Sequence, residues 1–396
     1  MPTGHIYTRK MSYNERMFAA ADRICPPVVN QLLFDGEGFL DIGLWRDAVA
    51  TASAANPGSR LVLRGLSGYS KWIDSGENPP VIEINAEGWD GMGPAGAPFL
   101  QDKMDLRKGP LCQVLLLRGN PLRVCFRTHH SIMDGRGTLA WAEDICSVLR
   151  GENPAGTSST ISDVELARSA RTDYRTPFAR DSIAPTGDAA DNLQGVTWKR
   201  IIIPGKFRNI LGQVAILTAK EAWRHGDGPV RFSIPVDLRQ HIPGLRSTGN
   251  LSIAIYIEIS RNSTPESVSA DIKNQLTEKR DCLLDRSDHI ISYIPLRLLT
   301  AIGKARLTTN FMKGKYGSSG IITNMTQVPL APFSGGGFTA TRFWGIPPAF
   351  ENVPYFMGMT YTSHDLQLVL TMPNRLADKG RIDRLLDNIR SGLQQA

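Results

Sequence analysis

The stretch His-His-Ser-Ile-Met-Asp-Gly, residues 129–135, constrains this chain more than any other, because it follows an apolar run from Leu122 to Phe126. That run predicts a buried strand, and the motif places two imidazoles, a carboxylate and a glycine at its exit. Consecutive side chains of a strand point to opposite faces of the sheet. We therefore expect one imidazole to meet a substrate and the other to support the loop.

The second histidine is the better candidate for chemistry. If the pleat continues through Thr128, His130 shares the face of Val124 and Phe126, whereas His129 falls on the face of Cys125. Histidine titrates near neutral pH, so a single ring can accept a proton from an alcohol or amine that attacks an electrophile. The opposite faces disfavour a shared metal ion, and no other Cys or His pair has ligand spacing, so we expect no metal.

The carboxylate of Asp134 has a different predicted role. A tight Asp-Gly turn favours a carboxylate that points inward and fixes the loop. An inward carboxylate needs a cationic partner, and Arg239, after the strand-like run from Val230 to Val236, is suited to a planar ion pair. Arg231 and Arg246 are rival partners. The pair would join distant parts of the chain.

His129, His130, Asp134 and Gly135 together resemble the HHxxxDG signature of the CoA-dependent acyltransferase superfamily. That superfamily includes nonribosomal-peptide condensation domains, polyketide-associated acyltransferases, wax-ester synthases and plant acyltransferases. Other segments resemble the family in the expected order, so the resemblance covers nearly the whole chain. They are Asn14-Glu15 to Leu33-Phe34, Asp41 to Ala54, Pro235 to Arg239, Gly249-Asn250 and Thr323-Asn324-Met325.

The resemblance implies an α/β fold, a two-lobed sandwich like chloramphenicol acetyltransferase, with the active-site channel between the lobes. It implies that His130 is the catalytic base, that His129 is supporting, and that Asp134 is structural and pairs with Arg239. Gly135 would leave the channel open, since a side chain there would narrow it. The family transfers an acyl group directly from a thioester to a hydroxyl or amine, with no metal and no covalent enzyme intermediate.

Three residues of the second half are candidates for the channel wall. By resemblance, Gly249 and Asn250 match an element near the active site of wax-ester synthases, where the Asn supports the catalytic region; a turn that starts a strand is the alternative. Thr323 and Asn324 follow an expected strand at 319–323. They would either stabilise a loop, which we favour, or place a donor near an oxyanion.

Departures from the family narrow the function. The chain lacks the Ser-x-Ala-Gln opening of peptide-synthetase condensation domains and has Arg136 where they usually carry Trp. The Asp-Phe-Gly-Trp-Gly element of the plant branch is absent, and the segment from Arg342 to Gly345 resembles that element only weakly. We therefore expect a free-standing acyltransferase or condensation enzyme that forms an amide or ester in nonribosomal-peptide or polyketide-type metabolism.

Two other classes of protein remain as alternatives. A catalytically silent, condensation-like scaffold would bind a carrier protein, and the intact His130, Asp134 and Gly135 argue against it. A dehydrogenase-complex acyltransferase core or chloramphenicol-type enzyme would carry a related motif near the C-terminus of a shorter, trimeric unit. Here the motif falls in the first half, so we expect a monomer.

Length and composition agree with a large soluble enzyme. The 396 residues and 41% hydrophobic content favour two lobes, which we place at 1–160 and 196–396 with a crossover linker at 161–195. Five cysteines without paired spacing and the absence of a signal or span favour the cytoplasm. The net charge of +7 could suggest nucleic-acid binding, but no recognised nucleic-acid motif accompanies it, so we expect no nucleic-acid partner. We expect no bound cofactor, and acyl-CoA or a phosphopantetheine-linked acyl carrier protein as donor.

Strands and helices are expected to alternate along both halves. The motif strand should run from Leu122 to Thr128 and be followed by a helix from Thr138 to Leu149, whose positive end lies beside the site. A Gly-, Pro- and Ser-rich stretch at 151–195 should be irregular. A helix is expected from Pro265 to Leu284.

Overall fold

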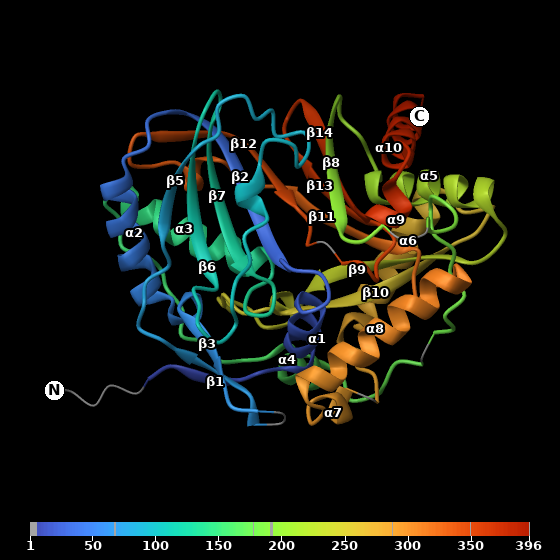
Figure 1. Cartoon of the computed structure of the whole chain (residues 1–396), viewed down its shortest axis with the longest axis horizontal. Coiled ribbons are helices and arrows are strands. Elements are labelled where there is room, and N and C mark those ends of the chain that lie inside the picture. Colours follow the sequence, from blue (N-terminus) through green and yellow to red (C-terminus); the bar gives the residue numbers. More distant parts are fainter. Residues whose placement is uncertain are drawn as a thin grey trace.

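We describe the fold from a computed structural model that covers residues 6–66, 69–176, 178–190, 193–286, 288–348 and 350–395 (Figure 1). Its strands are β1 Thr8–Lys10, β2 Val29–Gly38, β3 Leu61–Arg64, β4 Lys71–Asp74, β5 Val81–Asn85, β6 Cys112–Arg118, β7 Leu122–His129, β8 Val196–Pro204, β9 Val230–Asp237, β10 Ser252–Ile259, β11 Gly320–Gln327, β12 Phe338–Ile346, β13 Phe356–Tyr361 and β14 Asp365–Pro373. Its α-helices are α1 Tyr13–Asp22, α2 Ile42–Ala55, α3 Gly135–Leu149, α4 Asp163–Ala170, α5 Ile210–His225, α6 Pro265–Thr277, α7 Asp288–Ile291, α8 Leu296–Lys313, α9 Asn374–Ala377 and α10 Arg381–Gln394.

Two large mixed sheets form the two lobes of an α/β sandwich. The first-lobe sheet has the strand order β12-β2-β7-β6-β5, and the second-lobe sheet has the order β10-β9-β11-β13-β14-β8. A small sheet, β1-β4-β3, accompanies the first lobe. Helices α2 and α3 pack beside the first sheet, while α5 and α10 cover the second (Figure 1). The two-lobed α/β architecture expected from the sequence is confirmed.

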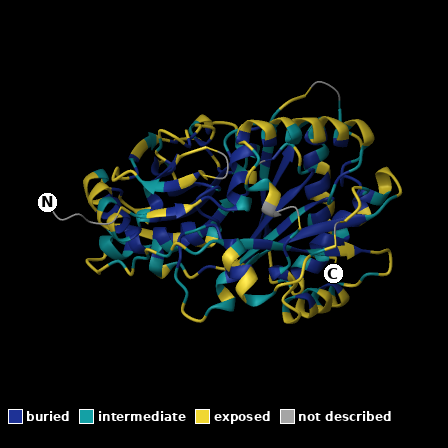
Figure 2. Ribbon diagram, turned by 90° about the horizontal axis from the view of Figure 1, so that it is seen from below, coloured by how far each residue is buried: buried dark blue, intermediate teal, exposed yellow. Residues whose placement is uncertain are grey.

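Burial follows this layering. The buried residues gather on the strands, and the exposed residues follow the outer faces of the helices (Figure 2). One apolar core lies between the first sheet and its helices, and includes Trp45, Phe126 and Trp141. A second core lies between the second sheet and its helices, and includes Phe232 and Leu385. Each lobe thus has its own hydrophobic core.

A buried polar network ties the lobes together. Asp35 on β2 lies 3.1 Å from Arg123 on β7 and 3.8 Å from Arg200 on β8. The indole of Trp344 on β12 donates a 2.8 Å hydrogen bond to Asp35, and the Arg200 guanidinium stacks 4.0 Å from that indole. Arg200 also donates to Gln367 on β14. Because buried charges are stable only when paired, this network fixes one arrangement of the two sheets.

Strand β12 was not expected from the sequence, and it crosses between the halves of the chain. It comes late in the sequence but pairs antiparallel with β2 at the edge of the first-lobe sheet, with Trp344 opposite Leu33. Its partner strand β2 lies about 300 residues earlier in the chain, so a local sequence pattern gives no information about this pairing. The division into lobes at 1–160 and 196–396 stays a prediction, and β12 is a second-half strand within the first sheet.

Two other expectations need correction. The stretch at 151–195 contains a helix, α4, which a capping box between Ser162 and Glu165 starts. The helix expected to reach Leu284 ends at Thr277, because the chain turns through a left-handed Lys279, with φ of 52°, into a short 3-10 helix, η5, at Arg280–Cys282. Among the helices of the described ranges, none is both long and apolar enough to cross a bilayer.

Candidate active site between the lobes

A cavity of about 210 Å³ lies between the two sheets, at the end of β7 where the His-His-Asp-Gly motif begins. His130, Asp134, Gly135 and Arg136 line it from the first lobe. Strands β9, β11 and β13 line it from the second lobe with both apolar and polar residues, among them Val236, Phe356 and Met359 beside Asp237, Thr323 and Asn324. The motif therefore faces a chamber to which both sheets contribute.

The ring of His130 is held in one orientation by its neighbours. Its Nδ1 lies 3.1 Å from the carbonyl oxygen of Met133, which can only accept a hydrogen bond. This contact favours the proton on Nδ1 and leaves Nε2 as the ring nitrogen that can accept one, although the amide nitrogen of Asn250, which is also a donor, lies 3.4 Å from Nδ1. Phe18 of α1 stacks on the imidazole, with ring centroids 4.1 Å apart. The His130 ring lines the cavity.

Two buried amides brace the loop around this ring. Asn250 donates a 2.7 Å hydrogen bond to the carbonyl oxygen of His130. Asn30 on β2 donates 2.8 Å to the carbonyl oxygen of Met133, the group that orients the imidazole. Both amides are buried, so they rigidify the loop rather than exchange with water. Asn250 thus supports His130 through its backbone, and it also lies two residues before β10, where its amide oxygen accepts a hydrogen bond from the hydroxyl of Ser252.

Burial lowers the pKa of His130 to about 4, and the repulsion of a charged ring by His129 adds to this, although Met133 and Asp134 act in the opposite direction. The folded protein therefore holds a neutral imidazole at neutral pH. Since the ordinary value is about 6.5, the unfolded chain binds more protons between pH 6.5 and 4. This group favours unfolding progressively as the pH falls through that window, and stability rises as the pH rises through it.

We expect an NMR titration of the His130 ring in the folded protein to have its midpoint near pH 4. The same chain in denaturant provides the control, where the midpoint should return to about 6.5. A folded-state midpoint at or above 6.5 would show that the ring is solvated or paired with a carboxylate, contrary to the geometry described above.

His129 points away from the cavity and is fully buried. Its Nδ1 accepts a 3.1 Å hydrogen bond from the backbone N–H of Ser131, and its Nε2 lies 3.5 Å from a carboxylate oxygen of Asp22 at the end of α1. The two adjacent imidazoles thus have separate surroundings. His129 connects the turn after β7 to α1, while His130 faces the cavity.

Asp134 and Arg239 form a two-pronged ion pair across the lobes. The guanidinium nitrogens Nη1 and Nη2 lie 3.0 and 3.2 Å from the two carboxylate oxygens of Asp134. Asp134 also accepts backbone hydrogen bonds from Gly137 and Leu251, both 2.7 Å long. Arg239 donates further to Asp237, Ser247 and Gly249, so every arm of the fork is engaged. The two arginines considered as alternative partners form other ion pairs: Arg231 contacts Glu258, and Arg246 contacts Asp144.

The surroundings of Asp134 keep it ionised. Burial alone would raise the pKa of this carboxyl, but Arg239 and the backbone donors outweigh burial and hold the pKa below its ordinary value. Asp134 is also the N-cap of α3, and its side chain accepts the hydrogen bond from the backbone N–H of Gly137. The positive end of α3 therefore stabilises the carboxylate of Asp134.

Two glycines of the motif region lie where a side chain would collide with a neighbour. A Cβ at Gly135 would lie 3.2 Å from the methyl group of Met325, across the cavity. A Cβ at Gly137 would lie 2.3 Å from the carbonyl oxygen of Thr248, so the start of α3 can pack on this backbone only without a side chain. The first glycine keeps the passage open and the second permits close contact between the lobes.

Thr323 and Asn324 lie within β11 and not after a strand, because β11 extends to Gln327. Both residues line the cavity. The side chain of Asn324 donates 3.4 Å to the hydroxyl of Tyr361 and accepts from the backbone N–H of Thr326. Asn324 thereby stabilises the irregular end of β11, where the pairing with β13 shifts register.

Sequence reasoning missed Phe18, Asn30 and the carbonyl of Met133, although each contacts His130 or its support. For Asn30 a signal exists: the adjacent amides Asn30 and Gln31 interrupt the apolar run from Val28 to Phe34, and buried amides usually have a specific hydrogen-bonding role. For Phe18 there is none, since an aromatic ring on a short helix is an ordinary core residue.

No family model matches the sequence, and no curated protein matches it either. Solved structures do match in fold over 98% of this chain. The first condensation domain of the calcium-dependent antibiotic synthetase, in complex with a substrate analogue, is 12% identical with a TM-score of 0.66, and 95% of that chain is covered. A variant of the starter condensation domain of rhizomide synthetase, in complex with C8-CoA, is 16% identical with a TM-score of 0.65 and 95% coverage.

The epimerization domain from the third module of tyrocidine synthetase B also matches, at 14% identity, a TM-score of 0.57 and 97% of that chain. The chain thus has the two-lobed fold of condensation domains, and the fold expected from the resemblance is confirmed. Because condensation and epimerization domains share this fold, the fold alone does not decide the reaction.

Proposed function

We propose that this chain is an acyltransferase that moves an acyl group from a thioester donor to an amine or hydroxyl acceptor. The acceptor attacks the thioester carbonyl while its proton passes to Nε2 of His130. The tetrahedral intermediate then expels the thiolate, which takes the proton back from Nε2–H. The product is an amide or ester together with a free thiol, and the donor is acyl-CoA or an acyl carrier protein.

One observation carries this proposal. Nδ1 of His130 is committed to the carbonyl oxygen of Met133, so Nε2 is left as the basic nitrogen of a ring that lines the cavity. The pKa of about 4 keeps this nitrogen unprotonated at neutral pH, as a general base requires. A base of low pKa is a weak proton acceptor in isolation, so the proposal needs the proton to be shared with the departing thiolate within one chamber.

The remaining motif residues position this base. We assign Asp134 and Arg239 to the structure of the loop, because each is fully engaged by the other and by backbone groups. Asn250 is assigned a supporting role through the His130 carbonyl. Thr323 and Asn324 are assigned to the cavity wall. None of these assignments requires a metal ion or a bound cofactor.

The cavity wall favours an apolar substrate portion. Leu32, Val236, Ile346, Phe356 and Met359 contribute to it. Apolar walls with a few fixed polar groups are typical of small-molecule sites. The exposed cation of Arg136 lies at the same cavity, beside the motif, and the chain carries a net charge of +7. Both features suit a donor that carries phosphate, as CoA and phosphopantetheine do.

The direct test is thiol release. The purified chain is incubated with panels of acyl-CoA and acyl-carrier-protein donors, each with amine and alcohol acceptors, and the free thiol and the product mass are measured. We expect thiol release that depends on the acceptor. Binding of a donor with release no faster than in buffer would contradict the proposal and favour the silent scaffold. Gel filtration completes the test, because a trimer would contradict the expected monomer.

Replacement of Gly135 by Leu should block the cavity. The added side chain would extend into Met325, so we expect thiol release to fall about 10-fold or more. The matched control is Gly135→Ala, whose Cβ meets only the flexible end of Met325 and should change the rate less. Gly135→Ala should unfold like the parent, because the left-handed backbone that demands glycine is not adopted at Gly135, and the denaturant midpoint of Gly135→Leu separates blockage of the cavity from destabilisation by overpacking. Equal rates for Leu and Ala would place the substrate path elsewhere.

A further inference from the structure

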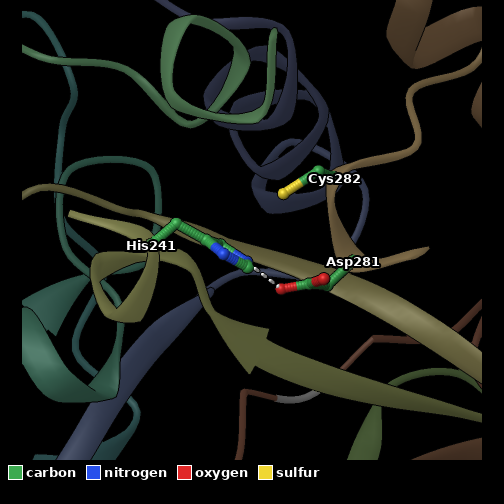
Figure 3. Close-up of side chains that lie close together, drawn as sticks. All are labelled: His241, Asp281 and Cys282. Atoms are coloured by element: carbon green, nitrogen blue, oxygen red, sulfur yellow. Dashed lines mark hydrogen bonds and ion pairs between the residues drawn. The ribbon is translucent and has the colours of Figure 1, made fainter. Parts of the chain in front are cut away.

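A second cluster of reactive side chains lies apart from the cavity. His241 ends a short 3-10 helix, η4, at Leu238–His241 that follows β9, and Asp281 and Cys282 lie in η5. Figure 3 shows the Cys282 sulfur pointing toward the imidazole and the carboxylate. One potential ligand atom from each of the three residues lies within 4.8 Å of the others. Nitrogen, oxygen and sulfur donors thus meet at one place.

The charge of this cluster is poorly compensated. Asp281 is fully buried, and its Oδ1 has no hydrogen-bond partner. Its Oδ2 lies 2.6 Å from Nε2 of His241 and 3.3 Å from the amide nitrogen of Gln240. Among the ion pairs of the described residues, Asp281 pairs with His241 alone. A buried carboxylate with one imidazole neighbour and an unsatisfied oxygen is costly, and a bound cation would remove that cost.

We propose that His241, Asp281 and Cys282 bind a divalent transition-metal ion of the zinc type. Imidazole, carboxylate and thiolate are the three side-chain donors that zinc prefers, and three protein ligands with one further position for water is a common arrangement. This site lies outside the acyl-transfer cavity, since none of the three residues lines it. It therefore does not depend on the proposed function.

A catalytic role for Cys282 fits the cluster less well. Its side chain is fully buried in a small apolar cluster with Leu166, Leu238 and Leu251, so a substrate cannot reach the sulfur. Burial, with Asp281 adding to it, raises the pKa of the thiol to about 11, which is opposite to what a nucleophile needs. A metal ion reverses this preference, because it binds the thiolate and displaces the proton.

Metal binding has a definite proton balance. The Cys282 thiol loses its proton to solvent, and Nε2 of His241 must present its lone pair, with any ring proton held on Nδ1. At least one proton is released for each ion bound. The unpartnered Oδ1 of Asp281 is one carboxylate donor for the ion; if Oδ2 ligates together with Nε2, their 2.6 Å separation widens to about 3.4 Å, as metal–ligand distances near 2.1 Å and a tetrahedral angle require. His241 keeps 13% of its side chain exposed and supplies the route by which an ion enters.

Bound metal would join η4 to η5. Arg239, which holds Asp134, lies in η4 two residues before His241. The two short helices come from segments 40 residues apart. If the helix had continued to Leu284 as expected, Asp281 and Cys282 would lie within it; because α6 ends at Thr277, they lie in η5 instead. The sequence predicted no metal site because only the fold brings these segments together.

The test is metal titration of the full chain after chelator treatment. Co²⁺ is added as the probe, and thiolate-to-cobalt charge-transfer absorption is recorded together with proton release. We expect one equivalent to bind, with at least one proton released, and Zn²⁺ to displace the cobalt signal and raise the unfolding temperature. Cys282→Ser should abolish the charge-transfer band, and His241→Ala should weaken binding about 100-fold.

The matched controls are Cys25→Ser and His225→Ala, which remove the same residue types outside the cluster and should leave the titration unchanged. Absence of one-equivalent binding by the unaltered chain would overturn the proposal, whatever the variants do. A charge-transfer band that survives Cys282→Ser but disappears in Cys25→Ser would also overturn it, since the metal would then lie elsewhere.

Discussion

The His130→Ala variant should lose about 100-fold to 10,000-fold of its acceptor-dependent thiol release, the range that general-base assistance typically contributes. The variant removes Nε2, the nitrogen left basic by the contact of Nδ1 with Met133. Among the described residues that line the cavity, His130 is the one histidine, and the ring of its neighbour His129 is buried against Ser131 and Asp22. The measurement is the rate of thiol release under saturating donor, compared with the parent chain.

This loss should come without loss of the fold. The alanine removes one ring contact with Phe18 and one hydrogen bond to Met133 from a side chain at the cavity wall, so we expect a modest shift of the denaturant midpoint and a chain that stays folded at neutral pH. His225→Ala removes a histidine on the outer helix α5 and provides the control, with an unchanged rate expected. Near-normal turnover in His130→Ala would reject the base mechanism while leaving the fold untouched.

Removal of the Asp134 carboxylate should have the largest effect on stability. Asp134→Ala leaves Arg239 without its two-pronged partner and leaves the N–H groups of Gly137 and Leu251 unsatisfied. Breaking a buried ion pair from one side costs about 3–5 kcal/mol, a large part of the about 5–15 kcal/mol that stabilises a typical domain. Denaturant unfolding measures this as a lower midpoint with an unchanged slope.

The pH dependence of this contribution has a definite sign. Because Arg239 and the backbone donors lower the pKa of Asp134, its stabilisation is present above the ordinary carboxyl value of about 3.9 and is lost as the pH falls through the native pKa. The difference in unfolding free energy between Asp134→Ala and the parent should therefore shrink only in acid, as the pH falls through the native pKa of Asp134. A parent chain with no extra loss of stability in that range would contradict the lowered pKa.

Two comparisons isolate the ion pair. Asp227→Ala breaks the exposed pair with Arg261 and should change stability by no more than about 0.5 kcal/mol. In the double variant Asp134→Ala, Arg239→Ala, the losses should not add, because each single change already destroys the same contact. An Asp134→Ala chain as stable as the parent but inactive would argue instead for direct participation of the carboxylate in the chemistry.

Much of the first lobe could be predicted from local pattern. The apolar run that becomes β7 and the motif after it are encoded within short windows, where side-chain period and turn chemistry determine the outcome. The Asp134–Arg239 contact was predicted because a buried carboxylate requires a cation and few arginines follow a strand end. Its two-pronged geometry and its ties to Leu251 were not.

The sequence by itself placed the two imidazoles on opposite faces of the motif strand and a glycine directly after the aspartate, since these depend on residue type and local spacing, while the two-lobed α/β architecture followed from the resemblance to a known superfamily. Only the tertiary structure decided which groups surround them. The carbonyl of Met133 that selects the His130 tautomer, the strand β12 that completes the first sheet, and the meeting of His241 with Asp281 and Cys282 all join segments distant in the chain. Such contacts arise from packing and burial across sheets, and a local pattern carries no record of them.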